Sequence, residues 1–284
     1  MPTHDDAEKT DESPVTLSAR EEEEVEQRTP PRAAVVFETV RREGEVELER
    51  PALSLVASGL AAGLSMGASL SAVGIVMAHL PDAPWRPLVA QLGYTIGFLI
   101  VVMGRQQLFT ENTVTVVLPL LAHPDKFGTL GKIARLWALV LASNIVGAIG
   151  FAFAVAHSGV FTADVKAAFD EIGRHAAAAP WGDQFTRGIF AGWLIALMVW
   201  LLPASGELRP FIIIIITYVV GIADLSHIVA GSIEVLYTVA LGETSWAAFF
   251  GGFFAPVLLG NIVGGVALVA LLNYGQVVSE GEPA

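Results

Sequence analysis

The stretches Gly104-Arg-Gln-Gln-Leu-Phe-Thr110 and Gly221-Ile-Ala-Asp-Leu-Ser-His227 interrupt two long hydrophobic segments of this 284-residue chain. They lie 117 residues apart, and the same interval separates Asn144-Ile-Val-Gly147 from Asn261-Ile-Val-Gly264. Polar, glycine-marked interruptions at matching places in two halves of a membrane protein are typical of a binding or permeation site near the bilayer midplane. The pattern therefore predicts a channel or a transporter.

The composition supports a membrane protein. The chain is 54% hydrophobic and 15% charged, with a mean hydropathy of +0.60, which is unusual for a soluble domain. Because it has no cysteine, disulfides and thiolate metal sites are excluded. No clustered carboxylates accompany a histidine, so neither a metal nor another cofactor is expected. Nothing is basic enough to predict nucleic-acid binding. The net charge of −12 is concentrated at the start, and we expect residues 1–31 to be a disordered acidic tail.

Hydropathy predicts six transmembrane spans in an all-α channel domain over residues 51–273, judged against the roughly 20 apolar residues that cross a bilayer. An amphipathic helix is expected over 32–50, a helical piece within the loop at 158–185, and a C-terminal tail over 274–284. Spans two and five exceed the length of one simple helix and contain the two breaks. The spans are 52–80, 87–122, 132–157, 186–203, 208–241 and 246–273.

The halves are expected to form an inverted three-plus-three repeat, because an odd number of spans per half makes the second half enter from the opposite side. In the first span of each half, Gly59-Leu-Ala-Ala-Gly63 resembles Gly188-Ile-Phe-Ala-Gly192, at an interval of 129. More Lys and Arg residues flank the spans on the side of the termini than on the other side. This distribution favours a plasma (inner) membrane protein with both termini in the cytoplasm.

The two breaks carry the candidate site. Non-helical backbone inside a membrane is tolerated only where protein or a watery cavity satisfies its polar groups. His227 at the second break and Thr110 at the first are expected to face each other across that cavity. Histidine exchanges a proton near neutral pH, so it is a candidate proton donor to a solute. The alternative is a neutral His227 bonded to a neighbouring carbonyl group.

Apolar side chains near the breaks are candidates for constrictions that exclude hydrated ions, while ordinary helix packing is the favoured explanation for each aromatic one. They are Tyr94, Phe98, Leu108, Phe109 and Leu225. Four charged residues also fall inside the predicted spans, namely Arg105, Glu111, Asp224 and Glu234. We expect these charges to pin the breaks, with Arg105 and Asp224 paired to each other.

With these residues in place, the chain resembles the formate/nitrite transporter family over roughly residues 35–273. The resemblance rests on Leu108-Phe109-Thr110, on His227-Ile228-Val229-Ala230, on the stretch from Gly188 to Trp200, and on Gly260-Asn261-Ile262-Val263-Gly264-Gly265. It implies an aquaporin-like fold, a homopentamer and one pore through each protomer.

The resemblance also implies roles for individual residues. The family's central histidine and its partner threonine, which form the selectivity site between two apolar constrictions, correspond to His227 and Thr110. Lys166 is the best match to a lysine that attracts anions at the outer mouth, and Asn144 and Asn261 match the asparagines of the spans. The chain departs from the family at Gly231, where an asparagine is usual, which indicates a divergent branch.

The resulting hypothesis is a channel or transporter for small monovalent anions such as formate, nitrite, lactate or hydrosulfide. Its partners are the anion, a proton and the lipid bilayer. Since a neutral acid crosses an apolar stretch far more cheaply than its anion, passage is expected to be linked to protonation through His227. Two alternatives stay open: a neutral-solute channel for water, ammonia or glycerol, and a non-conducting protein with an occluded pore. An enzyme is not expected, because no Gly-x-Ser-x-Gly elbow is present.

Overall fold

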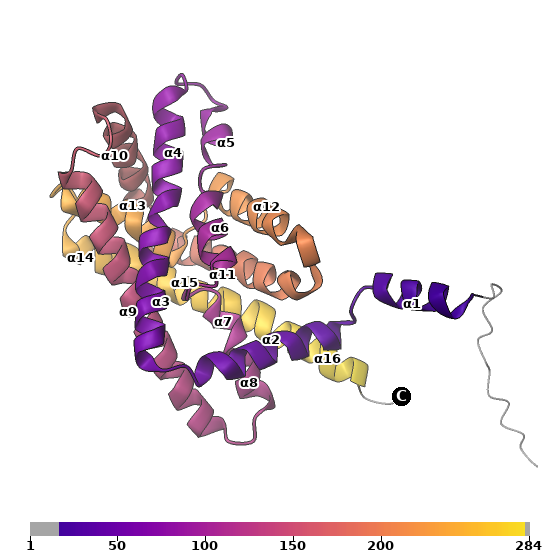
Figure 1. The fold of residues 1–284 in the computed structure, drawn as a ribbon. Helices are drawn as coiled ribbons and strands as arrows, with labels where there is room; N and C mark the ends of the chain where they lie inside the picture. Colours follow the sequence, from indigo (N-terminus) through magenta and orange to yellow (C-terminus); the bar gives the residue numbers. More distant parts are fainter. Residues whose placement is uncertain (1–16, 282–284) are drawn as a thin grey trace, which may run out of the picture.

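Helices make up almost all of residues 17–281, the part of the chain that the computed structural model describes (Figure 1). The first half contains α1 (Ala19–Arg28), α2 (Ala33–Leu48), α3 (Ala52–Ser65), α4 (Gly67–His79), α5 (Arg86–Ala90), α6 (Thr95–Met103), α7 (Asn112–Thr115), α8 (Val117–Ala122) and α9 (Lys126–His157). The second half contains α10 (Ala163–Ala178), α11 (Trp181–Leu201), α12 (Arg209–Ile222), α13 (Ile228–Ala240), α14 (Trp246–Ala248), α15 (Ala255–Gly265) and α16 (Leu272–Gly281). Short 3-10 turns at Leu202–Ala204 and Gly206–Leu208 lie between α11 and α12, and π-helical turns at Phe249–Phe254 and Val266–Leu271 flank α15.

Five continuous helical stretches within the described residues are long and apolar enough to cross a membrane. They are Ala52–His79, Arg86–Met103, Lys126–His157, Trp181–Ala204 and Trp246–Ser279. The segment expected as a broken fifth span, 208–241, is divided between α12 and α13. At about 1.5 Å per residue, neither helix alone reaches the roughly 30 Å of a bilayer core. The all-helical, multi-pass membrane architecture expected from hydropathy is therefore present.

The two ends of the described chain differ from the expected tails. Residues 1–16 of the expected disordered segment lie outside the described residues, but residues 19–28 form α1, which stands away from the other helices (Figure 1). Its glutamates favour helix, and Ser18 begins it with a capping box in which the Ser18 backbone N–H donates to Glu21 at 2.8 Å. At the other end, α16 continues to Gly281 where a tail was expected from residue 274.

Two helix pairs are the most closely packed in the described residues. Helix α3 packs on α9 in the first half, and α11 packs on α15 in the second. A Cβ added at Gly63 would lie 2.1 Å from the Asn144 carbonyl oxygen, and one added at Gly192 would lie 2.4 Å from the Asn261 carbonyl oxygen. Only glycine permits such close approach, which is how small residues hold helices together in lipid. Each close contact also fixes an asparagine beside a break.

Helix α2 is the amphipathic helix expected over 32–50. It buries Val36, Phe37 and Val40 and packs on α8. Glu38 on its outer face accepts hydrogen bonds from Arg41 at 2.7 Å and from Arg42 at 2.6 Å. These bonds lower the pKa of the Glu38 carboxyl to about 2. Two further glutamates on the polar side of α2, Glu43 and Glu47, lie beside the first break.

Candidate functional site

Each long broken segment turns out of helix in the same way. In the first segment, α6 ends at Met103 and α7 begins at Asn112. In the second, α12 ends at Ile222 and α13 begins at Ile228, directly after His227. In each break one non-glycine residue adopts the left-handed backbone region, Arg105 with φ of 51° and Asp224 with φ of 54°. Such conformations are uncommon outside glycine and persist where surrounding structure enforces them.

Asn144 on α9 holds the first break. Its Oδ1 accepts a hydrogen bond from the Phe109 backbone N–H at 2.9 Å. Its Nδ2 donates to the carbonyl oxygens of Gly59 and Gln107, both at 2.8 Å. The bonds to Phe109 and Gln107 satisfy backbone groups that have left helical form within the membrane-spanning region, and the bond to Gly59 ties them to α3. The side chain is fully buried and is committed to backbone partners.

Asn261 on α15 holds the second break in the same manner. Its Oδ1 accepts from the Ile228 N–H at 2.9 Å, and its Nδ2 donates to the carbonyl oxygens of Gly188 and Ser226 at 2.8 and 3.0 Å. Neither this side chain nor Asn144 lines either of the two cavities that lie beside the breaks. The two asparagines, expected at the transport site, are therefore bonded to backbone groups of the breaks and of the adjoining helices.

The hydrogen bonds align the two breaks at an interval of 119 residues, not the 117 inferred from the sequence. Phe109 corresponds to Ile228 through the asparagine bonds, and Arg105 corresponds to Asp224 through the shared left-handed turn. The interval of 117 holds for the asparagines because the first half has two more residues between break and asparagine. Leu108 is consequently the structural counterpart of His227.

Thr110 and His227 nevertheless meet at the centre of the molecule. The Thr110 hydroxyl lies 2.8 Å from His227 Nε2, and both side chains are buried. His227 Nδ1 accepts the backbone N–H groups of Val229 and Ala230, each at 3.2 Å, and so caps the N-terminus of α13. A nitrogen that accepts two N–H groups carries no proton, which places the ring proton of the neutral imidazole on Nε2, donating to Thr110.

Aromatic and aliphatic side chains surround this pair. The ring of Phe98 stands edge-on to His227 with centroids 5.0 Å apart, and Tyr94 follows at 5.3 Å from Phe98. Leu108 is buried. Phe109 is turned toward Trp137, with ring centroids 5.7 Å apart. Among the expected constriction residues, Phe98 thus contacts the pair directly, while Phe109 packs into the core.

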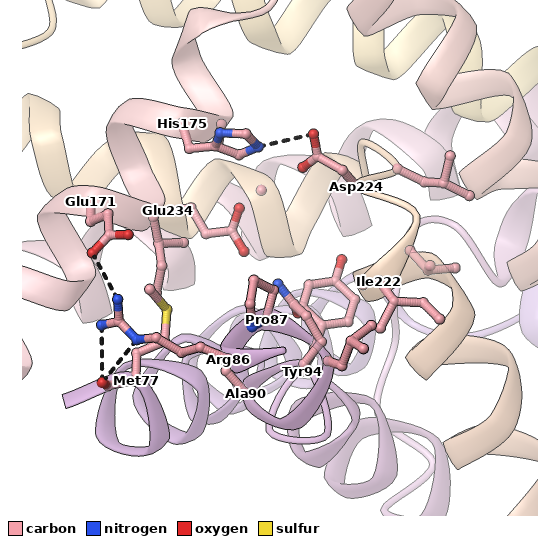
Figure 2. Close-up of a pocket in the computed structure, with 18 of the residues that line it drawn as sticks. Met77, Arg86, Pro87, Ala90, Tyr94, Glu171, His175, Ile222, Asp224 and Glu234 are labelled. Carbon is pink, nitrogen blue, oxygen red and sulfur yellow. Dashed lines mark hydrogen bonds and ion pairs between the residues drawn. The ribbon is translucent and has the colours of Figure 1, made fainter. Parts of the chain in front are cut away.

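Two cavities approach the Thr110–His227 pair from different ends. The larger, about 750 Å³, is lined by His227 and Leu225 and reaches α5 and α10 (Figure 2). The smaller, about 280 Å³, is lined by Leu108 and reaches α2. In Figure 1, α5 and α10 lie at the top of the bundle and α2 at the bottom. The pair with its apolar neighbours is therefore the partition between two hollows.

The expected ion pair between Arg105 and Asp224 does not form. Arg105 lies 3.4 Å from Glu43 of α2, beside the smaller cavity. Asp224 accepts from Arg187 at 2.5 Å and from His175 at 2.9 Å, in the larger cavity. The prediction was wrong because the two breaks turn toward opposite ends of the bundle. Glu111 and Glu234 likewise lie apart, Glu111 in the smaller cavity and Glu234 in the larger.

Lys166, expected at the outer mouth, is turned away from the larger cavity. Its Nζ donates to the carbonyl oxygens of Ala156 and Ser158, at 3.1 and 2.5 Å. The cations that line this cavity are Arg86 and Arg187. Arg86 donates to the Met77 carbonyl oxygen, at 2.9 Å from Nη2, and lies 3.8 Å from Glu171 (Figure 2). The sequence did not single out Arg86 as a cavity-lining residue.

Phe253 is a second residue that the sequence did not single out. It lies in the π-helical turn Phe249–Phe254 and lines the larger cavity together with His227 and Gly231. A Cβ added at Gly231 would lie 2.5 Å from Phe253 Cζ. The absence of the usual asparagine at Gly231 is thereby explained, because the phenylalanine ring occupies the space. Within residues 17–281, no group of three or more His, Asp or Glu side chains is arranged to hold a metal ion.

Comparison with known proteins gives a consistent result. Residues 34–275 match the family model described as "Formate/nitrite transporter". The chain is 44% identical over 252 residues to "Inner membrane protein YfdC" of Escherichia coli (strain K12), covering 89% of this chain and 81% of that protein. It is 29% identical over 207 residues to "Probable formate transporter" of Methanothermobacter thermautotrophicus, covering 66% and 74%. A solved structure described as "Pentameric formate channel with formate bound" superposes with a TM-score of 0.68 at 20% identity, covering 80% of this chain and 98% of that one.

Proposed function

The chain belongs to the formate/nitrite transporter family, and we propose that it conducts small monovalent anions of weak acids, such as formate or nitrite, through each protomer. The observation that carries this proposal is the Thr110–His227 hydrogen bond at the partition between two cavities. The relatives described as formate transporters and channels favour this function over a neutral-solute channel or an occluded pore.

The proposal includes a fold with six spans in an inverted three-plus-three repeat. In it, α5 to α8 form one broken span and α12 with α13 form the other. The matched asparagine bonds and the matched left-handed turns support this assignment. The relatives' descriptions support an inner-membrane location and a homopentamer, and the distribution of Lys and Arg favours cytoplasmic termini.

The chemistry at the partition follows from the direction of its hydrogen bonds. Because His227 Nε2–H donates to the Thr110 oxygen, the Thr110 hydroxyl proton is free to donate to an anion. Phe98 and Leu108 keep this stretch apolar, where an ion is much more costly than its neutral acid. We therefore propose that the anion is protonated in one cavity, passes Thr110 as the neutral acid and loses the proton in the other.

Uptake into proteoliposomes tests the proposal. Formate, nitrite and chloride are compared at two pH values, with the wild type beside His227→Asn. As a matched control, His79→Asn removes an exposed histidine at the end of α4. The expected result is uptake of the weak-acid anions, not chloride, that rises in acid and collapses only in the His227 variant. Formate uptake indifferent to pH, or equal in His227→Asn and wild type, contradicts the proposed mechanism. Osmotic swelling without anion uptake indicates a neutral-solute channel.

A further inference from the structure

The hydrogen bonds of His227 leave the pore without an obvious proton donor. Nδ1 accepts two backbone N–H groups of α13, and Nε2 is bonded to Thr110. A proton delivered from the ring to an anion would have to break the Thr110 bond, and a proton arriving at Nδ1 would have to displace the helix cap. If weak acids cross in neutral form, as proposed above, another group in the pore must exchange the proton.

Glu234 occupies a suitable place in the larger cavity. His227, Gly231 and Glu234 follow the spacing i, i+4 and i+7, which puts them on one face of α13, and all three line the cavity. Figure 2 shows the Glu234 carboxyl group pointing into this cavity. Among the described residues, nothing donates a hydrogen bond to it or forms an ion pair with it. An acid on the wall between the mouth and the partition is therefore free to meet a solute.

The charged groups that share this cavity are engaged elsewhere. They are Asp82, Arg86, Glu171, His175, Arg187 and Asp224. Arg86 donates to the Met77 carbonyl oxygen, while Arg187 and His175 donate to Asp224. Tyr94 lines the same wall as a neutral phenol. Because no cation compensates Glu234, holding it as a carboxylate in this enclosed site is costly, which favours exchange of a proton with cavity water.

Glu111 is the carboxyl group beside the partition in the smaller cavity. It directly follows Thr110 in the chain, and its Oε1 is buried without a hydrogen-bond partner. The charged groups around it are Glu43, Glu47, Arg50, Arg105 and Arg209. Arg105 pairs with Glu43, Arg50 pairs with Glu47, and Arg209 donates to the Leu202 carbonyl oxygen. Glu111 is thus also an uncompensated carboxyl group facing a cavity.

We propose that Glu234 and Glu111 are proton-exchange groups, one at each side of the Thr110–His227 partition. In the larger cavity the protonated Glu234 carboxyl gives its O–H proton to the entering anion, and the resulting carboxylate takes a proton from hydronium in the cavity water. The neutral acid passes Thr110. In the smaller cavity its O–H bond breaks, and the proton goes to the Glu111 carboxylate and then to water. One anion and one proton cross together, so no net charge moves.

Substitution of one carboxyl at a time tests this inference. Glu234→Gln keeps the size of the side chain and removes proton exchange, whereas Asp82→Asn changes a fully exposed carboxyl of the same cavity. Formate uptake is measured against pH on each side of the membrane separately. Glu234→Gln is expected to reduce the acid-stimulated uptake roughly a hundredfold, the lower end of the range for general acid catalysis, with Asp82→Asn unchanged. Glu234→Asp, which retains a carboxyl group, restores part of the pH response.

The wild type separates failure of this inference from failure of the proposed function. Absence of weak-acid uptake by the wild type refutes the proposed function. Wild-type uptake with an unchanged pH profile in Glu234→Gln overturns the inference and leaves the function intact. Size-exclusion chromatography establishes that each variant is assembled. Should Glu234→Gln fail to assemble, Glu111→Gln gives the same test from the other side, with loss of response to acid at the smaller cavity expected.

Discussion

The first break, between α6 and α7, and the second, between α12 and α13, share a backbone arrangement but differ in the side chains it presents. Both turn through one left-handed residue, and both are tied by an asparagine that makes three hydrogen bonds. At equivalent positions, however, Leu108 stands where the other break has His227. The two halves therefore share their backbone geometry, but only the second half has a histidine at this position.

A second difference lies one helical turn further on. Asn112 in the first half donates its side-chain amide to Gln107 at 3.0 Å and to the Leu108 carbonyl oxygen at 3.2 Å, which fills the space beside the break. Its structural counterpart, Gly231, has no side chain and leaves room for the ring of Phe253. The first break is thus closed by a polar side chain of its own segment, and the second by an aromatic ring from the π-helical turn before α15.

Removal of either asparagine should have the largest effect and tests whether the two breaks are equally held. Asn144→Ala and Asn261→Ala should each lower the unfolding free energy by roughly 3 kcal/mol or more, since an orphaned buried polar group costs about 1–3 kcal/mol. Thermal unfolding of the purified assembly measures the loss. Asn273→Ala is the control, because the Nδ2 of Asn273 has no hydrogen-bond partner. A melting curve like that of the wild type for only one of the two asparagine variants would show that the breaks are not equally held.

The contact between Gly231 and Phe253 gives the next largest effect and is specific to the second break. Gly231→Ala should destabilise the protein by about 1–3 kcal/mol through overpacking and should reduce anion flux. Phe253→Leu in the same chain should restore both, because the added methyl group then has space. Gly251→Ala, in the same π-helical turn but with no atom within 4 Å of the new Cβ, serves as control. Additive effects in the double-mutant cycle would show that the two positions are independent.

Glycine substitution at the two left-handed residues should have a smaller effect on stability, and this effect should differ between the two breaks. Arg105→Gly relieves a backbone conformation that costs a non-glycine residue roughly 1–2 kcal/mol, and it loses only an exposed pair with Glu43. We expect it to be neutral or to stabilise the protein by up to about 1 kcal/mol, because added glycine flexibility offsets part of the gain. Asp224→Gly loses the bonds to Arg187 and His175 as well, so it should melt lower than Arg105→Gly. The reverse order of melting temperatures contradicts this reading.

The smallest effect concerns α2, which covers only the first break. Arg41 and Arg42 lower the pKa of Glu38 to about 2, below the usual value of 4.5. The ion pairs of Glu38 therefore contribute their full stability above pH 4.5, the usual pKa of the carboxyl group. They lose this contribution as the pH falls through the lowered pKa of about 2. Because Glu38 is partly exposed, the contribution should be a few tenths of a kcal/mol. Melting temperatures of wild type and Glu38→Gln should differ slightly near neutral pH and converge toward pH 2. A constant difference across that range would exclude this ion pair as the cause.

The sequence was sufficient for the helical membrane architecture, the family and the meeting of Thr110 with His227. Hydrophobic length and two glycine-marked polar interruptions carry that information. The register of the breaks was not predicted. The sequence shared by the stretches around Asn144 and Asn261 gives the alignment of α9 with α15, and the breaks follow a different interval. The breaks themselves are aligned by backbone hydrogen bonds that leave no mark in residue identity.

Other features depended on distances that the sequence does not contain. Whether Lys166 faces solvent or a carbonyl group is decided by the path of the loop before α10. The roles of Arg86 and Phe253 arise from elements distant in sequence that line one cavity. The capping box of Ser18 and Glu21, by contrast, was present in the sequence, and the surrounding acidic composition concealed the short helix that it begins.

The asparagine bonds also bear on the order in which the protein matures during synthesis. The Phe109 amide can form its hydrogen bond only after Asn144, 35 residues later in the chain, has been synthesised. The Ile228 amide likewise requires Asn261, 33 residues later. All partners of each asparagine belong to its own half. Each half can therefore complete its break as soon as its own last long helix is inserted, before the other half is needed. The Thr110–His227 bond then joins two units that are already finished.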